Sequence, residues 1–268
     1  MAIDPGGHRA RKRFGQNFLH DQRVIDRIAR SIRVKPDDWL VEIGPGQGAL
    51  TEALLAGKPK KLQAIELDRD LVPGLKVQFF SEPAFDVLEA DALKTDFRTL
   101  LPEADTLRVV GNLPYNISTP LIFHILEAAD RIHDMHFMLQ REVVERLVAR
   151  PGTSDYGRLS VMAQYRCAIT HVFDVGPGAF RPAPKVWSAI VRLVPHEQLP
   201  FLCKDEKLLA QVVRQAFSQR RKTLRNGLKT LLSAEDWEVL PVDPSRRPET
   251  LSVEEFVQVT NFIAEKEA

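Results

Sequence analysis

The stretch of sequence that decides the fold is WLVEIGPGQGALT, residues 39–51. Residues 39–43 are mostly apolar and predict a buried strand, a glycine-rich turn follows, and the residues from Ala49 onward suit a helix. Glycines in such a turn let the backbone approach a bound molecule where a side chain would collide. This order of strand, turn and helix predicts the first unit of a Rossmann-like α/β fold.

A second predicted strand, residues 62–67, carries an acidic residue near its end, about 20 positions after the glycine turn. Glu66 is therefore well placed to accept hydrogen bonds from two ribose hydroxyls. The pattern is ambiguous, because Gly44, Gly46 and Ala49 also satisfy the dinucleotide fingerprint. The local sequence indicates an adenosine-containing cofactor and leaves its identity open.

Further strands and helices follow at the spacing of an α/β sheet and predict a Rossmann-like domain over residues 1–198. The late strands are expected to form an antiparallel edge, and everything from residue 200 onward is predicted to be helical, which gives a small helical domain over 199–268. The strands are predicted over 85–90, 107–110, 135–139, 168–175 and 186–194, and the helices over 21–32, 71–80, 119–129, 141–150, 159–168 and 252–264, with Asp21 as a helix cap.

The end of the predicted strand 107–110 carries groups suited to chemistry on the amino group of an aromatic base. Asn112 can accept a hydrogen bond from such an amine, and so can the Leu113 carbonyl, since Pro114 keeps the residue before it extended. Tyr115 would stack on the base. The alternative is an ordinary strand-to-helix turn in which Asn112 is a cap and Tyr115 belongs to the core.

Two loop residues have a functional and a structural interpretation. Asp91, at another strand end, would contact an adenine amino group or cap a helix. Phe180 begins a loop that Pro182 and Pro184 keep extended. Its ring would form the second wall of a base pocket opposite Tyr115, or it would anchor the loop.

Basic residues gather in two segments, and we expect both to contact RNA phosphates, the alternative being solvated charged faces. One segment is an amino-terminal arm that Phe14 and Phe18 would dock on the body, and the other follows the apolar stripe of residues 208–217. The candidate contacts are Arg11, Lys12, Arg13, Arg220, Arg221, Lys222 and Arg225.

The 268 residues are 44% hydrophobic, enough for a large domain and a small one, and the net charge of +1 is uninformative. No apolar run approaches the roughly 18 residues of a membrane span, and the amino terminus lacks a signal-peptide core, so we expect a cytoplasmic protein. Cys167 and Cys203 are expected to be free thiols. A serine-hydrolase elbow and a nucleotide phosphate loop are absent, and His133 and His136 lack partner ligands, so no metal is expected.

Several of these segments, taken together, resemble one known family, the small-subunit ribosomal RNA adenine dimethyltransferases or KsgA family. The similarity runs from about Arg9 to the carboxyl terminus, and the blocks in register are specific although each alone is modest. They are residues 15–19 (GQNFL), 42–48 (EIGPGQG), 66–68 (ELD), 91–92 (DA), 112–118 (NLPYNIS), 180–186 (FRPAPKV) and 219–226 (QRRKTLRN).

The resemblance implies a class I methyltransferase domain over 1–198, with a flexible basic arm at 1–13, and a helical RNA-binding domain over 199–268. It implies an enzyme that uses S-adenosylmethionine to dimethylate N6 of two adjacent adenosines near the 3′ end of 16S rRNA in an immature small subunit. Carried over by position, the cofactor site would contain Gln16, Asn17, Leu19, Gly44, Gly46, Glu66, Leu67, Asp91, Ala92 and Asn112. The target base would be held by Asn112, Leu113, Pro114, Tyr115 and Phe180.

Two positions depart from the family pattern: Trp187 replaces an expected acidic residue, and Gly227 an expected serine. Three other hypotheses stay open. A nucleotide-dependent oxidoreductase would explain the glycine turn and Glu66, but not residues 112–115. The related erythromycin-resistance methyltransferases modify a large-subunit adenosine through a similar motif, and a ribosome-assembly factor could use the same scaffold. We expect a monomer.

Overall fold

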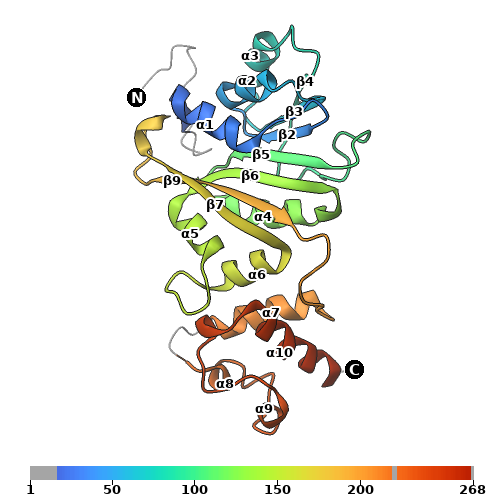
Figure 1. Ribbon diagram of the computed structural model, residues 1–268, viewed down its shortest axis with the longest axis vertical. Helices are drawn as coiled ribbons and strands as arrows, with labels where there is room; N and C mark the ends of the chain where they lie inside the picture. Colours follow the sequence, from blue (N-terminus) through green and yellow to red (C-terminus); the bar gives the residue numbers. More distant parts are fainter. Residues whose placement is uncertain (1–16, 219–221, 267–268) are drawn as a thin grey trace. The chain divides into compact units, whose positions relative to one another are not determined.

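The computed structural model describes residues 17–218 and 222–266, which form two compact units (Figure 1). One unit contains the described residues up to Val144 together with Thr170–Pro195. The other contains Glu145–Ile169 and the described residues from His196 onward. Residues 145–169 therefore pack with the helical unit, and the functional division of the chain at residue 198 stays a prediction.

The first unit is built on a seven-stranded sheet with the strand order β4-β3-β2-β5-β6-β9-β7. Neighbouring strands from β4 to β6 are parallel, and β9 runs antiparallel to β6. The predicted Rossmann-like sheet is confirmed, as is an antiparallel strand near its edge. The strands are β2 (Trp39–Ile43), β3 (Lys61–Glu66), β4 (Phe85–Glu89), β5 (Leu107–Asn112), β6 (Ile132–Gln140), β7 (Cys167–Val175) and β9 (Ser188–Pro195).

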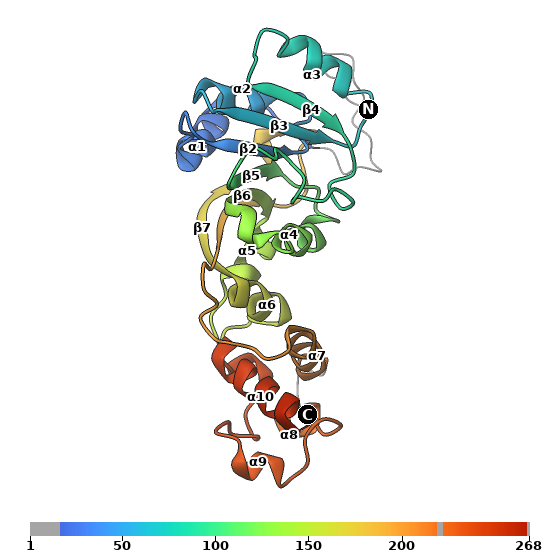
Figure 2. The same cartoon turned by 90° about the vertical axis from the view of Figure 1, so that its right-hand side faces the viewer.

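Helices cover both faces of this sheet, as parallel strands that are apolar on both sides require. Figure 2 shows α1 and α4 on opposite sides of β2, β5 and β6. Side chains of α1, α2 and α3 pack with one face of the strands in a single core cluster that includes Ile28, Leu54, Leu75, Leu40 and Leu62. The helices are α1 (Gln22–Ile32), α2 (Ala49–Ala56), α3 (Val72–Gln78), α4 (Ser118–Leu126) and α5 (Arg141–Val148).

Local sequence explains where α1 begins and which face it buries. The Asp21 carboxylate accepts hydrogen bonds from the backbone N–H groups of Arg23 (2.9 Å) and Val24 (3.3 Å), which confirms the predicted cap. The isoleucines of the helix face the core at positions spaced three and four apart, and the helix ends at Arg33 in the left-handed conformation (φ 53°). The buried set is Ile25, Ile28 and Ile32.

A two-stranded sheet that the sequence did not predict lies beside the main one. β1 (Phe18–Leu19) pairs antiparallel with β8 (Phe180–Arg181), with Phe18 opposite Arg181 and Leu19 opposite Phe180. Strands this short leave no detectable periodicity in a sequence. Their pairing fixes the segment after residue 16 at one end of the main sheet.

Strand β6 begins before the predicted range 135–139. The prediction missed its first residues because polar residues interrupt the apolar run there. Asp134 is buried, and its carboxylate accepts a hydrogen bond from Arg108 Nε of β5 (2.8 Å). Arg108 Nη1 also donates to Asp38 (2.6 Å). A buried carboxylate is tolerated where cations and hydrogen bonds satisfy it, so this part of the strand keeps its place in the sheet.

The second unit is all-helical within its described residues apart from the first residues of β7. Its core joins side chains of several helices, including Val212, Leu228, Trp237 and Phe256. None of the helices formed by residues 17–218 and 222–266 has the length and apolar content of a membrane span. Cys167 and Cys203 are free thiols, as predicted. The helices are α6 (Arg158–Arg166), α7 (Glu206–Ala216), α8 (Leu224–Gly227), α9 (Asp236–Val239) and α10 (Val253–Lys266).

Candidate active site

A pocket of about 200 Å³ lies at the carboxyl ends of β2, β3, β4 and β5. Ligands of open α/β sheets bind in this position, where several strand ends bring loop residues together. The structure unites here the predicted cofactor and base contacts, apart from Phe180 and from Gln16, which lies outside the described residues. Among the residues that line the pocket are Asn17, Leu19, Gly44, Gly46, Glu66, Leu67, Asp91, Ala92, Asn112, Leu113, Pro114 and Tyr115.

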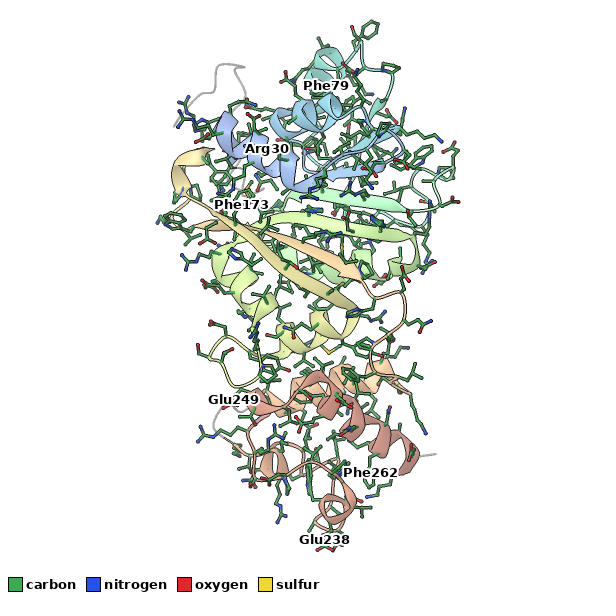
Figure 3. The ribbon with its side chains drawn as sticks, in the orientation of Figure 1. Arg30, Phe79, Phe173, Glu238, Glu249 and Phe262 are labelled. Atoms are coloured by element: carbon green, nitrogen blue, oxygen red, sulfur yellow. The ribbon has the colours of Figure 1, made fainter. Side chains whose placement is uncertain are left out.

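The turn after β2 forms the floor of the pocket, and its glycines are needed for their backbone shape. Gly44 (φ 65°) and Gly46 (φ 59°) adopt the left-handed conformation. A Cβ atom on Gly46 would also lie 3.1 Å from the Phe18 ring, which lines the same pocket. Further along the turn, a Cβ on Gly48 would lie 2.8 Å from the ring of Phe79, which is labelled in Figure 3. The missing side chains at Gly46 and Gly48 thus leave room for the rings of Phe18 and Phe79 against the turn.

Glu66 ends β3 at the pocket, as predicted, and its carboxylate is held by the backbone. Oε2 accepts a hydrogen bond from Gly46 N (3.2 Å) and Oε1 accepts one from Asp68 N (2.8 Å). Burial raises the pKa of Glu66, and these N–H donors oppose the rise by favouring the ionised form. Each oxygen keeps a further lone pair, so the group can still accept hydrogen bonds from a diol.

Glu42 lines the pocket as well, although sequence reasoning did not select it as a site residue. It is 2% exposed, and Thr51 Oγ1 donates a hydrogen bond to its Oε2 (2.7 Å). Burial raises the pKa of Glu42 to about 7, and the nearby Glu66 acts in the same direction. The sequence did contain a signal for Glu42, because an acidic residue within an apolar strand is unfavourable unless it has a partner or a function.

Asn112 and Leu113, at the end of β5, line the pocket and carry two hydrogen-bond acceptors, the Asn112 amide oxygen and the Leu113 carbonyl. Asn112 Nδ2 donates to the backbone carbonyl of Asn17 (3.1 Å), which leaves Asn112 Oδ1 as the free end of the amide. Leu113 continues the hydrogen bonding between β5 and β6, because its backbone N–H donates to Met138 O (3.2 Å). Within the described residues the Leu113 carbonyl accepts no hydrogen bond. A Cβ on Gly111 would lie 2.7 Å from Ile43 O, so glycine lets β2 and β5 approach here.

Tyr115 follows these acceptors and is held at its far end. Its hydroxyl shares a 2.9 Å hydrogen bond with Ser188 Oγ, and Ser188 is 1% exposed at the start of β9. The ring is half-buried and lines the pocket. The interpretation of Asn112 as a helix cap is wrong, because α4 begins at Ser118 and no side chain caps it.

Asp91 and Phe180 occupy different surroundings. Asp91 lines the pocket, and its Oδ1 accepts a hydrogen bond from Leu93 N (3.0 Å) in a turn that begins no helix. Phe180 is 2% exposed in the core cluster with Phe173, labelled in Figure 3, and does not line the pocket. Its ring is buried as the loop-anchor interpretation expects. Contacts of Asp91 with adenine and of Phe180 with a target base stay predictions.

The predicted RNA contacts are only partly within the described residues. Lys222 and Arg225 are exposed in the helical unit, and Arg225 lies on α8. Within residues 17–218 and 222–266, no group of three or more His, Cys, Asp or Glu side chains could hold a metal ion. The predicted RNA contacts that lie outside the described residues are Arg11, Lys12, Arg13, Arg220 and Arg221, and the predicted cofactor contact Gln16 lies outside them as well.

The parallel sheet with an antiparallel strand near its edge, the glycine turn and the acidic end of β3 define a class I methyltransferase fold. Solved structures agree. A dimethyladenosine transferase from Plasmodium falciparum has a TM-score of 0.78 and 28% identity, covering 90% of this chain and 95% of that one. The 23S rRNA methyltransferase ErmE has a TM-score of 0.72 and 25% identity, covering 92% and 100%.

Sequence comparison defines the class further. The family model "Ribosomal RNA adenine dimethylase" matches residues 7–265. The ribosomal RNA small subunit methyltransferase A of Pseudomonas syringae pv. tomato is 62% identical over 259 residues, 97% of this chain and 96% of that protein. The enzyme of the same name from Pseudomonas aeruginosa is 62% identical over 258 residues, 96% of each. The chain belongs to the ribosomal RNA adenine dimethylase family, whose members use S-adenosylmethionine.

Proposed function

We propose that this protein dimethylates N6 of two adjacent adenosines near the 3′ end of small-subunit rRNA, using S-adenosylmethionine. The observation that carries the proposal is the orientation of Asn112. Its amide nitrogen is bound to Asn17 O, so its oxygen and the Leu113 carbonyl are two acceptors beside the Tyr115 ring. This set of groups suits an amine on a flat base.

The pocket has the groups that the cofactor needs. S-Adenosylmethionine supplies an electrophilic methyl group. Glu66 would accept hydrogen bonds from the ribose hydroxyls, and the exposed backbone of the glycine turn would lie against the amino-acid portion. Asp91, at the end of β4, would accept a hydrogen bond from the adenine amino group of the cofactor. Asn17, Leu19, Leu67 and Ala92 would complete the cofactor site.

The acceptors at β5 would prepare the amine of the target base. Its lone pair is delocalised into the ring, and hydrogen bonds to Asn112 Oδ1 and the Leu113 carbonyl would draw the nitrogen toward tetrahedral geometry. The Tyr115 ring would stack on the extruded base, which offsets part of the cost of a few kcal/mol for extrusion. Positioning would supply most of the catalysis, because the amine loses its proton as it gains the methyl group.

Dimethylation follows from the same geometry. After the first transfer the nitrogen keeps one hydrogen, which can still be bound by one of the two acceptors. Rotation of the new methyl group away from them leaves the lone pair available for a second transfer. Neither step requires a strong general base.

The small subunit is the favoured target because the 62% identical relatives are named small subunit methyltransferases. ErmE shares the fold at 25% identity, so a large-subunit target is the second candidate. A nucleotide-dependent oxidoreductase is excluded by membership of the family. We further propose an immature small subunit as the substrate particle, a role in its assembly, and a monomeric, metal-free enzyme in the cytoplasm.

Nucleoside mass spectrometry of rRNA tests the proposal. Small-subunit and large-subunit rRNA would be isolated from matched cells with and without this protein. We expect N6,N6-dimethyladenosine in small-subunit rRNA only when the protein is present. Loss of the modified nucleoside from large-subunit rRNA instead would assign the second target, and no change in either rRNA would refute the methyltransferase function.

A further inference from the structure

An exposed segment, residues 181–187, is tied at both ends to residues that line the pocket. At its start, β8 pairs with the pocket-lining residues Phe18 and Leu19. At its end, the buried Ser188 shares a hydrogen bond with the Tyr115 hydroxyl. An extended chain spans at most about 3.3–3.6 Å per residue, so a segment of this length stays within roughly 25 Å of both points. It therefore lies on the protein surface within reach of the proposed base site.

The segment presents apolar side chains to solvent. Val186 is 43% exposed and Trp187 is 53% exposed, although most large apolar residues of this unit are buried. The Trp187 ring lies against the backbone of Gly176, with ring atoms 3.6–4.0 Å from where a Cβ of that glycine would be. Its backbone carbonyl accepts a hydrogen bond from Arg141 N (2.9 Å). One side of a large ring is thus supported, and much of the remainder is open.

Two cations precede this ring in the same exposed segment. Arg181 and Lys185 are exposed, and among the described residues no ion pair is found for either side chain. Arg141, next to the Trp187 carbonyl, is in contrast 3.6 Å from Asp174. Exposed aromatic rings together with unpaired cations are typical of surfaces that bind single-stranded nucleic acid through stacking and phosphate contacts. A charge-neutral apolar surface would favour a protein partner instead.

We propose that residues 181–187 bind the single-stranded RNA next to the target adenosine, with Trp187 stacking on a neighbouring base and Arg181 and Lys185 contacting phosphates. The inference rests on the proposed function, because a base that enters the pocket brings its neighbouring nucleotides to the pocket's rim. It adds a contact surface to the predicted basic arm and helical domain. It also gives the departure from the family pattern at Trp187 a role in substrate binding.

Intrinsic fluorescence of the full-length protein gives a direct readout. The chain has tryptophans at 39, 187 and 237, of which Trp237 is only 4% exposed and Trp39 is half-buried. A single-stranded oligoadenylate would quench the wild-type signal through Trp187. The Trp187→Phe variant should lose this quenching and bind nearly as well, because a ring remains. The Trp187→Ala variant should bind about 5- to 150-fold more weakly, the range expected for the loss of one base stack.

Matched variants separate stacking from general surface effects. Phe80→Ala removes an aromatic side chain that is 88% exposed on another surface, outside the pocket lining, and should leave affinity unchanged. Replacing both Arg181 and Lys185 by Gln should reduce the slope of log affinity against log salt by about 1.4, at ~0.7 per phosphate contact for single strands. Unchanged affinity in Trp187→Ala, or quenching that persists in Trp187→Phe, would overturn the inference.

Methyl transfer to small subunits from cells lacking the protein distinguishes this inference from the function on which it rests. If wild type transfers no methyl groups, the proposed function fails. If wild type is active, we expect Trp187→Ala to raise KM with kcat nearly unchanged. Wild-type KM in that variant would refute the docking role alone. Loss of binding to a ribosomal protein, with RNA affinity intact, would assign the segment to a protein partner and also overturn it.

Discussion

The hydrogen bond between Tyr115 and Ser188 allows the ring and the hydroxyl of Tyr115 to be tested separately. Tyr115→Phe keeps the ring and removes one partner of the 2.9 Å contact, whereas Tyr115→Ala removes both. If the ring face acts by stacking, the Ala variant should lose about 1–3 kcal/mol of transition-state stabilisation, a factor of about 5–150 in turnover. The Phe variant should retain most of its activity.

The effects of these substitutions on stability should differ from their effects on activity. Tyr115→Phe leaves the hydroxyl of Ser188, which is 1% exposed, without a partner, at a cost of about 1–3 kcal/mol. Ser188→Ala leaves the hydroxyl of a half-buried tyrosine that can reach water, so it should lose only about 0.5–1.5 kcal/mol. Combining Tyr115→Phe with Ser188→Ala should be less destabilising than the sum of the two, because both remove the same bond.

The assays are single-turnover methyl transfer to immature small subunits with labelled cofactor and denaturant unfolding of the same variants. Calorimetric titration with S-adenosylmethionine controls for damage to the cofactor site. Full activity in Tyr115→Ala, or a Phe variant as inactive as the Ala variant, would refute the stacking role. Additive stability losses in the double variant would refute a functional Tyr115–Ser188 hydrogen bond.

Three further predictions concern the cofactor site, pH and RNA. Glu66→Ala should weaken S-adenosylmethionine binding measured by calorimetry, and equal affinity would exclude the ribose contact. Burial raises the pKa of Glu42 from 4.5 to about 7, so the folded protein keeps a proton that the unfolded chain releases, and stability should fall as pH rises through that window and then level off. Glu42→Gln should flatten this dependence by on the order of 3 kcal/mol in cofactor-free unfolding experiments, and identical pH profiles would contradict it. Neutralising Arg220, Arg221, Lys222 and Arg225 should reduce the salt slope of RNA binding by about 2.8–3.6, whereas weaker binding with an unchanged slope would indicate misfolding.

Much of the sheet could be predicted because its strands are short apolar runs between turn residues. The glycine turn and the acidic end of β3 lie at one pocket, as predicted, since parallel strands bring their carboxyl ends to one edge. The start of β6 was missed because Asp134 is polar, and only its pairing with Arg108 of β5 explains how it can be buried. A hydrogen bond between residues 26 positions apart leaves no local signal.

The same limit applies more strongly at the active site, where the decisive contact joins Asn112 to Asn17, 95 residues away. The sequence motif around Asn112 supplies an amide but does not say whether its oxygen or its nitrogen faces the pocket. The carbonyl of Asn17 decides this by accepting from Nδ2, and Asn17 directly precedes β1, which pairs with β8. Asn17 and Leu19 also line the same pocket. One short segment therefore lines the pocket and orients the Asn112 amide, so we expect a substitution in this segment to affect both the proposed cofactor contacts and the proposed contacts of the target amine.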